Sequence, residues 1–172
     1  MKTARLIITL DCPRSCPYCC NKQGDMLESA TRISDLRELD GYDEVCVTGG
    51  EPMIDPWRTM KIVAFLQTFD FKKIYLYTAM FGLRMDRLLK MVDGVHYTLH
   101  APLTRKDVNG FYRMQALVSD DPDKSCRLYI DPGIISPITI YPDAWARVEV
   151  KPWLDDCPLP PNETLFILED EK

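Results

Sequence analysis

Cys12-Pro13-Arg14-Ser15-Cys16-Pro17-Tyr18-Cys19 places three cysteines close together, with the spacing C-x3-C-x2-C. A short apolar run, residues 6–10, comes directly before this stretch. Such a run, bounded by charge and proline, is typical of a buried strand, so we expect the cysteines in a loop at its carboxyl end. Thiolates are soft ligands, and three of them can hold three corners of a cubane iron–sulfur cluster. One iron then stays open to another molecule.

A second motif, Thr48-Gly49-Gly50-Glu51-Pro52, follows the next strand-like run, residues 44–47. Glycines without side chains let the backbone approach a ligand closely, and Glu51 adds an acceptor for an ammonium group. The pair of glycines by itself also fits an ordinary turn. Its place at the end of a strand beside the cysteine loop favours ligand binding.

Together the two motifs resemble the radical S-adenosylmethionine (radical SAM) family, whose cluster motif is C-x3-C-x-aromatic-C, with Tyr18 as the aromatic residue. The resemblance covers residues 6 to about 52. It implies a [4Fe–4S] cluster on Cys12, Cys16 and Cys19, and reductive cleavage of S-adenosylmethionine to a 5′-deoxyadenosyl radical that takes hydrogen from a substrate. An electron donor such as flavodoxin or ferredoxin is implied too. The residues expected to contact S-adenosylmethionine are Tyr18, Thr48, Gly49, Gly50, Glu51, Thr78 and His100.

Length and composition favour one globular domain over the 172 residues, which are 46% hydrophobic. We expect a core over about residues 4–151 and an acidic, proline-containing tail over 152–172 that lies on the surface or closes one end. The net charge of −5 argues against nucleic acid as a partner. With no apolar run of membrane-spanning length and no signal peptide, we expect a cytoplasmic protein without a membrane partner.

Strand-like and helix-like segments alternate after the cysteine loop, which predicts an α/β fold with parallel strands. A full eight-fold barrel typically needs about 250 residues, so six strands predict a partial (β/α)6 barrel, the architecture that the family uses. Residues 131–146 are expected to be irregular, with one helical turn near 143–145. The expected strands are 6–10, 45–48, 74–78, 95–100, 127–130 and 148–150. The expected helices run from Ser29 to Gly41, from Asp55-Pro56 through Ile62, Phe65, Leu66 and Phe69, over 85–92 and over 111–118.

Side chains alternate along a strand, so the polar set of each late strand should point away from the outer helices, into the barrel. This set is His96, Thr98, His100, Arg127, Tyr129, Asp131, Glu149 and Lys151. Buried ionisable groups are costly unless they are paired or bind something. The set therefore predicts either a self-paired network, such as Glu149 with Lys151 or Arg127, or a site for a small polar substrate. The candidate catalytic residues are His100, Tyr129, Glu149 and Lys151.

The four other cysteines allow further interpretations. Cys20 could be the fourth ligand of a zinc site, although adjacent Cys19 and Cys20 make poor tetrahedral partners. A second cluster could use Cys20, Cys46, Cys126 and Cys157, but their spacing does not form a compact binding loop. Cys46 fits a small core residue of a strand. A secreted disulfide framework is not expected.

Three functions stay open at this stage. The first is a radical SAM enzyme acting on a nucleoside, nucleotide or amino acid derivative. The second is an activase of a glycyl radical enzyme, such as that of anaerobic ribonucleotide reductase, which has similar length and cysteine spacing and acts on a partner protein. Among small-substrate enzymes of the first kind, the queuosine-pathway enzyme that makes a deazaguanine has a similar Thr-Gly-Gly-Glu-Pro segment. Its first two cysteines are usually separated by a much longer gap than in this chain. The third is a non-catalytic iron–sulfur binding module.

Overall fold

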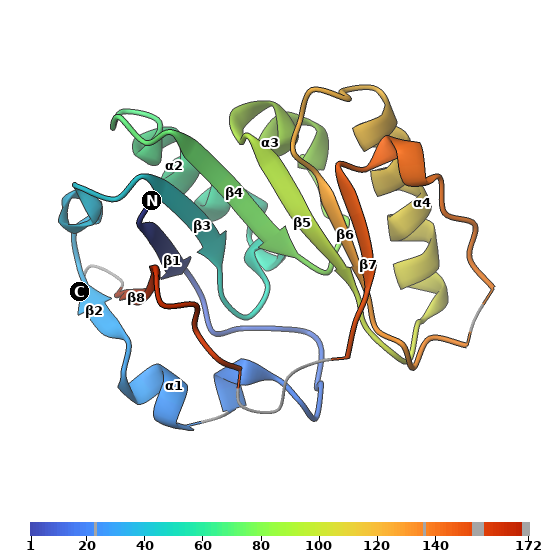
Figure 1. Cartoon of the computed structure of the whole chain (residues 1–172), viewed down its shortest axis with the longest axis horizontal. Coiled ribbons are helices and arrows are strands. Elements are labelled where there is room, and N and C mark those ends of the chain that lie inside the picture. The colour runs from blue at the N-terminus through green and yellow to red at the C-terminus, as the bar shows by residue number, and fades with distance from the viewer. Residues whose placement is uncertain (23, 136, 153–156, 170–172) are drawn as a thin grey trace.

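The computed structural model describes residues 1–22, 24–135, 137–152 and 157–169. In these residues the protein is α/β, with one sheet of eight parallel strands (Figure 1). The strands are β1 Thr3–Ile7, β2 Thr31–Ile33, β3 Glu44–Thr48, β4 Lys73–Thr78, β5 Gly94–Leu99, β6 Arg127–Ile130, β7 Arg147–Val150 and β8 Glu163–Leu168. The helices are α1 Gly24–Glu28, α2 Pro56–Leu66, α3 Met85–Met91 and α4 Arg105–Ser119, with short 3-10 helices η1 Cys20–Lys22, η2 Leu36–Leu39, η3 Pro52–Ile54 and η4 Pro142–Ala144.

The strands lie in the order β2-β8-β1-β3-β4-β5-β6-β7, and every neighbouring pair is parallel. From β1 through β3 to β7 the order follows the sequence, so each connection leads to the adjacent strand. Because all strands run in the same direction, their carboxyl ends share one edge of the sheet. The loops that follow β1, β3, β4, β5 and β6 therefore meet at that edge, where ligand sites of parallel sheets are usually found.

Helices α2, α3 and α4 cover one face of the sheet (Figure 1). The strand residues that alternate toward them are apolar and buried, as expected for a face packed on helices. This core includes Val95, Tyr97 and Leu99 of β5 with Leu66, Leu88 and Phe111 of the three helices. We call the opposite face, turned away from α2, α3 and α4, the inner face. At its β8–β1 end it carries a smaller apolar cluster of Ile7, Leu165 and Ile167 with Leu27 beside it.

Helix α2 begins where the sequence predicts. The Asp55 side chain accepts a hydrogen bond from the Arg58 N–H, and Pro56 occupies the first helical position. The helix ends at Leu66, so the expected continuation to Phe69 is wrong, and Phe65 is exposed. The other predicted elements from β3 to β7 occur within about one or two residues of their expected bounds, except that α4 begins earlier.

The helix expected from Ser29 to Gly41 is wrong. Residues 31–33 form the short strand β2, which pairs with β8, and only η2 is helical in the segment that follows. Asp35 and Glu38 form a capping box around η2, so this single turn is stabilised locally and ends before Gly41. The spacing of Ile33, Leu36 and Leu39 fits a helix. The pairing of Ile33 with the distant strand β8 instead makes residues 31–33 a strand.

Of the two expectations for the C-terminal segment, lying on the surface or closing one end, the described part fits the second, because it adds a strand at the β1 end of the sheet. Strand β8 is inserted into the sheet between β1 and β2, with Thr3 in register with Glu163 and Ile7 with Ile167. Phe166 is buried in the main core. The sheet therefore has eight strands among the described residues where the sequence predicted six. Part of the expected tail is thus a strand of the sheet, second from its edge.

Candidate functional site

The two motifs of the sequence lie side by side at the carboxyl edge of the sheet. Strand β1 pairs with β3, and backbone hydrogen bonds continue beyond both strands. The Gly50 N–H donates to the Thr9 carbonyl at 2.7 Å, and the Glu51 N–H donates to the Asp11 carbonyl at 2.8 Å. The Gly-Gly-Glu segment is thus bonded to the residues that lead directly into Cys12.

The two glycines leave room for this neighbouring backbone. A Cβ on Gly49 would meet the Thr9 carbonyl oxygen, and one on Gly50 would meet the Asp11 carbonyl oxygen, each well under 3.0 Å. Gly49 also has φ +139°, a conformation that favours glycine. We expected a ligand to occupy the space beside Gly50. The structure corrects this reason, because the loop before the cysteines occupies it.

Glu51 and Thr78, which the sequence singled out separately, share one buried network. The carboxylate of Glu51 accepts from Thr78 Oγ1 at 2.6 Å, from the Met53 N–H at 2.9 Å and from the Ala79 N–H at 2.9 Å. Glu51 is 2% exposed, and burial raises the pKa of its carboxyl although these hydrogen bonds oppose the shift. The network ties the end of β3 to the end of β4. Three of about four acceptor positions of the carboxylate are occupied.

Cys12, Cys16 and Cys19 are free and partly exposed in the loop after β1. Burial raises the pKa of the Cys12 and Cys16 thiols. Their chemistry fits an iron–sulfur cluster, because thiolates are the usual ligands of iron in such clusters. Their positions do not converge: in the part of the chain that the structure describes, no three His, Cys, Asp or Glu side chains gather closely enough to hold a metal ion.

Cys20 is joined to Cys157 by a disulfide bond. It links the residue directly after Cys19 to the segment that leads into β8. Because the sulfur of Cys20 is used in this bond, the arrangement does not provide a fourth zinc ligand. The other members of the alternative cluster, Cys46 and Cys126, are separately buried in the core, so the structure does not gather that set either.

Tyr18 holds the cysteine loop to the ends of β5 and β6. Its hydroxyl donates to Asp131 Oδ2 at 2.7 Å, and its ring lies 6.0 Å from the ring of His100. Burial and the hydrogen bond to Asp131 raise the pKa of the Tyr18 phenol, so it stays protonated at neutral pH. Burial and the positive charge of Arg14 lower the pKa of His100 to about 4, so its imidazole is neutral.

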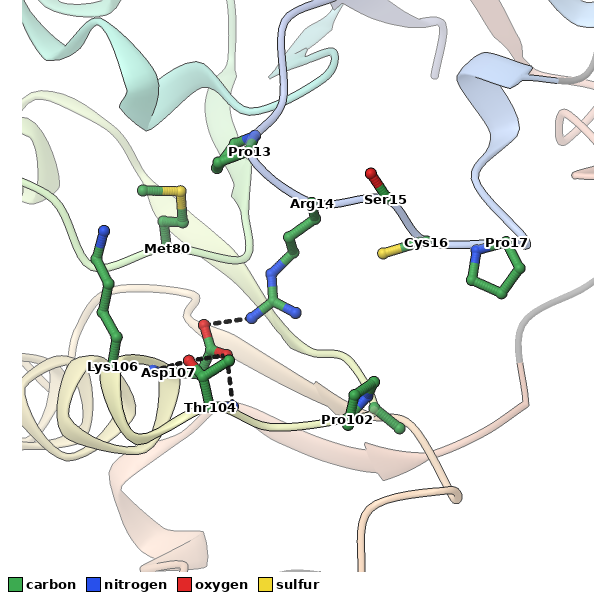
Figure 2. A pocket seen from close by; sticks show the side chains of 11 residues that line it. Pro13, Arg14, Ser15, Cys16, Pro17, Met80, Pro102, Thr104, Lys106 and Asp107 are labelled. Atoms are coloured by element: carbon green, nitrogen blue, oxygen red, sulfur yellow. Dashed lines mark hydrogen bonds and ion pairs between the residues drawn. The ribbon is translucent and has the colours of Figure 1, made fainter.

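Beside the cysteine loop lies a cavity of about 340 Å³. Figure 2 shows Arg14, from between Cys12 and Cys16, reaching across it to form an ion pair with Asp107 of α4. Asp107 also completes a capping box with Thr104 at the start of the helix. The remaining lining is mostly apolar and includes Pro13, Pro17, Met80, Ala101 and Pro102.

Sequence reasoning missed Arg14 and Asp107 as residues of this site. The pattern Thr104-x-x-Asp107 was a sufficient signal for the start of α4. No local pattern predicts the pairing of Asp107 with Arg14, because the two residues are far apart in the chain. Thr48, in contrast, lies where expected, at the end of β3, and its carbonyl accepts from the Ile8 N–H at 3.0 Å.

The other candidate catalytic residues form a separate group at β6 and β7. Glu149 is ion-paired with Arg147 and, at 3.5 Å, with Lys151, whose ammonium lies 4.2 Å from the centre of the Tyr129 ring. The self-paired interpretation therefore holds for Glu149 and Lys151. The side chain of Lys151 is 58% exposed, so the expectation of a buried charge is wrong there. These contacts do not include His100, which lies with Tyr18.

The sequence matches no protein-family model, and none of the curated proteins matches it. Its resemblance to the radical SAM family therefore rests on the residues of the two motifs, and the activity is a matter for proposal. Within the described residues, none of the helices combines the length and the apolar character that crossing a membrane requires.

Proposed function

We propose that this chain is a radical SAM enzyme that abstracts hydrogen from a small polar substrate in the cytoplasm. The observation that supports this most is the bonding of the Gly-Gly-Glu segment to the cysteine loop, through Gly50 and Thr9 and through Glu51 and Asp11. A turn that only reversed the chain would not need to hold the residues before Cys12. The two motifs on which the resemblance rests thus lie together at the edge where parallel sheets usually bind ligands, which supports the proposal.

The proposed cluster is [4Fe–4S], held by Cys12, Cys16 and Cys19, with S-adenosylmethionine on its open iron. When bound, the two together supply one-electron chemistry that ends in removal of a hydrogen atom from the substrate. Flavodoxin or ferredoxin is the proposed electron donor. We also propose that β1 and β3 to β7 act as the six-stranded partial barrel of this family, extended at one edge by β8 and β2.

The protein side chains position and shield the ligands in this proposal. Gly49 and Gly50 keep the cysteine loop close to β3, and Glu51 holds its carboxylate beside Thr78 with about one acceptor position left for an ammonium group. Tyr18 fixes the loop against Asp131, with the neutral imidazole of His100 nearby. These contacts restrict motion of the reacting groups, which is how an enzyme gains from orientation.

An activase of a glycyl radical enzyme is the second candidate. Strand β7 is the last strand of the sheet, and within the described residues no strand covers its outer edge. Val150 of this strand is 64% exposed and Lys151 beside it is exposed as well. An open side would admit the glycine-bearing loop of a partner protein. A non-catalytic iron–sulfur module is the remaining alternative.

Anaerobic reconstitution with iron and sulfide tests the proposed ligands. The wild-type protein should bind about four irons per chain. Cys12→Ala should abolish the cluster and the activity, whereas the matched variant Cys46→Ala, which alters a buried thiol away from the loop, should retain both. Loss of iron in Cys46→Ala together with retention in Cys12→Ala would overturn the assignment.

Release of 5′-deoxyadenosine and methionine separates the enzyme from a passive module. Reduced, reconstituted wild-type protein should form both from S-adenosylmethionine, and Cys12→Ala should form neither. A protein that holds the cluster but releases neither product would be the non-catalytic module. Addition of candidate small molecules or of a glycyl radical enzyme then separates the two catalytic candidates by which of them accelerates the release.

A further inference from the structure

His96 of β5 is buried on the inner face, and none of the described residues forms a hydrogen bond with its side chain. Its side chain is 4% exposed, and neither Nδ1 nor Nε2 has a partner in the described part of the chain. Buried polar side chains in proteins are nearly always bonded, and leaving one unbonded is costly. Among the described residues, no hydrogen bond joins this imidazole to the network at Glu51.

Three tyrosines surround the imidazole. The ring of Tyr77 lies 4.2 Å from it, that of Tyr75 5.3 Å and that of Tyr129 5.8 Å, all measured between ring centres. These rings come from β4 and β6, the two neighbours of β5. Lys151 lies over the Tyr129 ring, and its side chain is 58% exposed, so this flexible cation stands between the ring and solvent.

Within the described part of the chain, the charges that act on His96 come from three cations. Burial first, then the charges of Arg127, Arg5 and Lys151, lower the pKa of its imidazole to about 3. His96 is therefore neutral at physiological pH and can both donate and accept a hydrogen bond.

Two of these cations already have a carboxylate partner. Arg5 is ion-paired with Glu163, and Lys151 with Glu149. Arg127 is half-buried and has no ion pair among the described residues; it also lies in register with Arg147 of β7, a second cation on the same face. Counted over the described residues, Arg5, Arg127, Arg147 and Lys151 outnumber Glu149 and Glu163, so the region carries more positive than negative charge. A half-buried guanidinium and a buried imidazole, both without a polar partner, are donors suited to an anionic group.

We propose that the inner face around His96 binds the anionic group, a carboxylate or a phosphate, of a small molecule. Arg127 supplies the charge, and the neutral imidazole of His96 supplies a hydrogen bond. Tyr75, Tyr77 and Tyr129 provide an aromatic wall for the remainder of the ligand. Identifying this ligand as the substrate rests on the proposed function, whereas the binding of an anion does not.

Nuclear magnetic resonance of the imidazoles tests the site directly, because the chain has only two histidines. In ¹⁵N-histidine-labelled protein at constant ionic strength, inorganic phosphate and sodium acetate are titrated separately, and His96→Phe assigns the signals. We expect the His96 signals to move and saturate with at least one of the two anions, and the tighter one defines the class. Failure of both to move them, or equal movement with sodium chloride, would overturn the proposal.

Arg127→Gln should weaken that binding by about tenfold or more, because it removes a charged donor. Arg87→Gln makes the same change in charge on α3, on the other side of the sheet, and is the matched control. It should leave the affinity unchanged. Equal weakening by both variants would mean a general effect of net charge and would contradict a site at Arg127.

His96→Phe separates a ligand-binding histidine from a structural one. Phenylalanine fills a similar space without a polar atom, so the ligand-free variant should keep or raise its Tm. The rise in Tm that the anion causes in the wild type should disappear in the variant. A lower Tm with an unchanged anion response would overturn the proposal. None of these measurements reads catalysis, so their failure is distinguishable from absence of 5′-deoxyadenosine release.

Discussion

Glu51 and His96 are buried to nearly the same extent, at 2% and 4% exposure, but their surroundings are opposite. Glu51, at the carboxyl edge, accepts three hydrogen bonds from groups at or after the ends of β3 and β4. His96, on the inner face, has none among the described residues. A satisfied buried group adds rigidity, whereas an unsatisfied one costs stability until something binds it.

This difference divides the molecule into a structural edge and a receptive face. At the edge, Glu51 and Tyr18 hold loops in place through hydrogen bonds within the chain, with about one acceptor position of Glu51 left open. On the inner face, His96 and Arg127 present donors that no residue described by the structure uses. Changes at the edge should therefore lower stability, and changes on the inner face should alter binding.

The largest loss of stability is expected at Gly50. Gly50→Ala places a Cβ against the Asp11 carbonyl and should lower the free energy of unfolding by at least about 3 kcal/mol, because backbone must move. Gly94→Ala is the matched control, since its Cβ would meet the Ser125 carbonyl equally closely, on a strand away from Cys12, Cys16 and Cys19. Both losses are measured by chemical denaturation.

The two glycine variants should differ in iron binding. Only Gly50→Ala displaces the residues before Cys12, so it should lower the iron bound per folded chain after reconstitution, while Gly94→Ala should not. A Gly50→Ala protein with wild-type stability would show that the close approach to Asp11 is easily relieved. The backbone at the carboxyl edge of the sheet would then be less rigid than we infer from the three hydrogen bonds of Glu51.

Glu51→Gln should destabilise the protein by about 1.5–3 kcal/mol, since it replaces a charged acceptor and offers a donor to groups that donate. The pKa of Glu51 is raised in the folded state, so between its unfolded and folded pKa values the folded protein binds more protons. Wild-type stability due to this group therefore falls as pH rises through that window. The destabilisation by Glu51→Gln should be larger below the window than above it.

Urea denaturation of the wild type and of Glu51→Gln across this pH range checks the prediction. His96→Phe, which removes an unbonded polar group at similar burial, is the natural comparison and should show no such loss. If Glu51→Gln were neutral at every pH, the network with Thr78 would not be the stabilising contact that its distances indicate.

The smallest loss is expected for Tyr18→Phe, about 1 kcal/mol, because it removes the hydrogen bond of a half-buried hydroxyl to Asp131 and its longer contact with the Ala101 carbonyl. Burial acts to raise the pKa of Asp131, but hydrogen bonds from Tyr18 and from the N–H groups of Gly133 and Ala101 outweigh it, and the pKa is lowered. Stability from this carboxylate is present above its unfolded pKa and is lost as pH falls through the folded pKa.

The destabilisation by Tyr18→Phe should therefore be present at neutral pH and shrink in acid, the reverse of the trend for Glu51→Gln. Thermal unfolding followed by circular dichroism at several pH values measures it. A loss that stayed constant down to acid pH would mean that the hydroxyl does not act through Asp131.

Several features of the fold and the site were determined by local sequence. Alternating strand and helix patterns predicted the parallel sheet, because parallel neighbours need a crossover and local periodicity reports each element. Asp55-Pro56 predicted the start of α2, because a cap and a proline act within one turn. The two motifs predicted that the loops after β1 and β3 would be neighbours, since each follows a strand of the same sheet.

Only the tertiary structure decided which distant groups meet. The strand β2 is three residues long and has no signal of its own, and its pairing with β8 depends on contacts across more than a hundred residues. The same holds for Arg14 with Asp107, for Tyr18 with Asp131 and for the absence of a described partner for His96. Local patterns report propensity and exposure, whereas a hydrogen bond between remote residues exists only after the chain has closed around it.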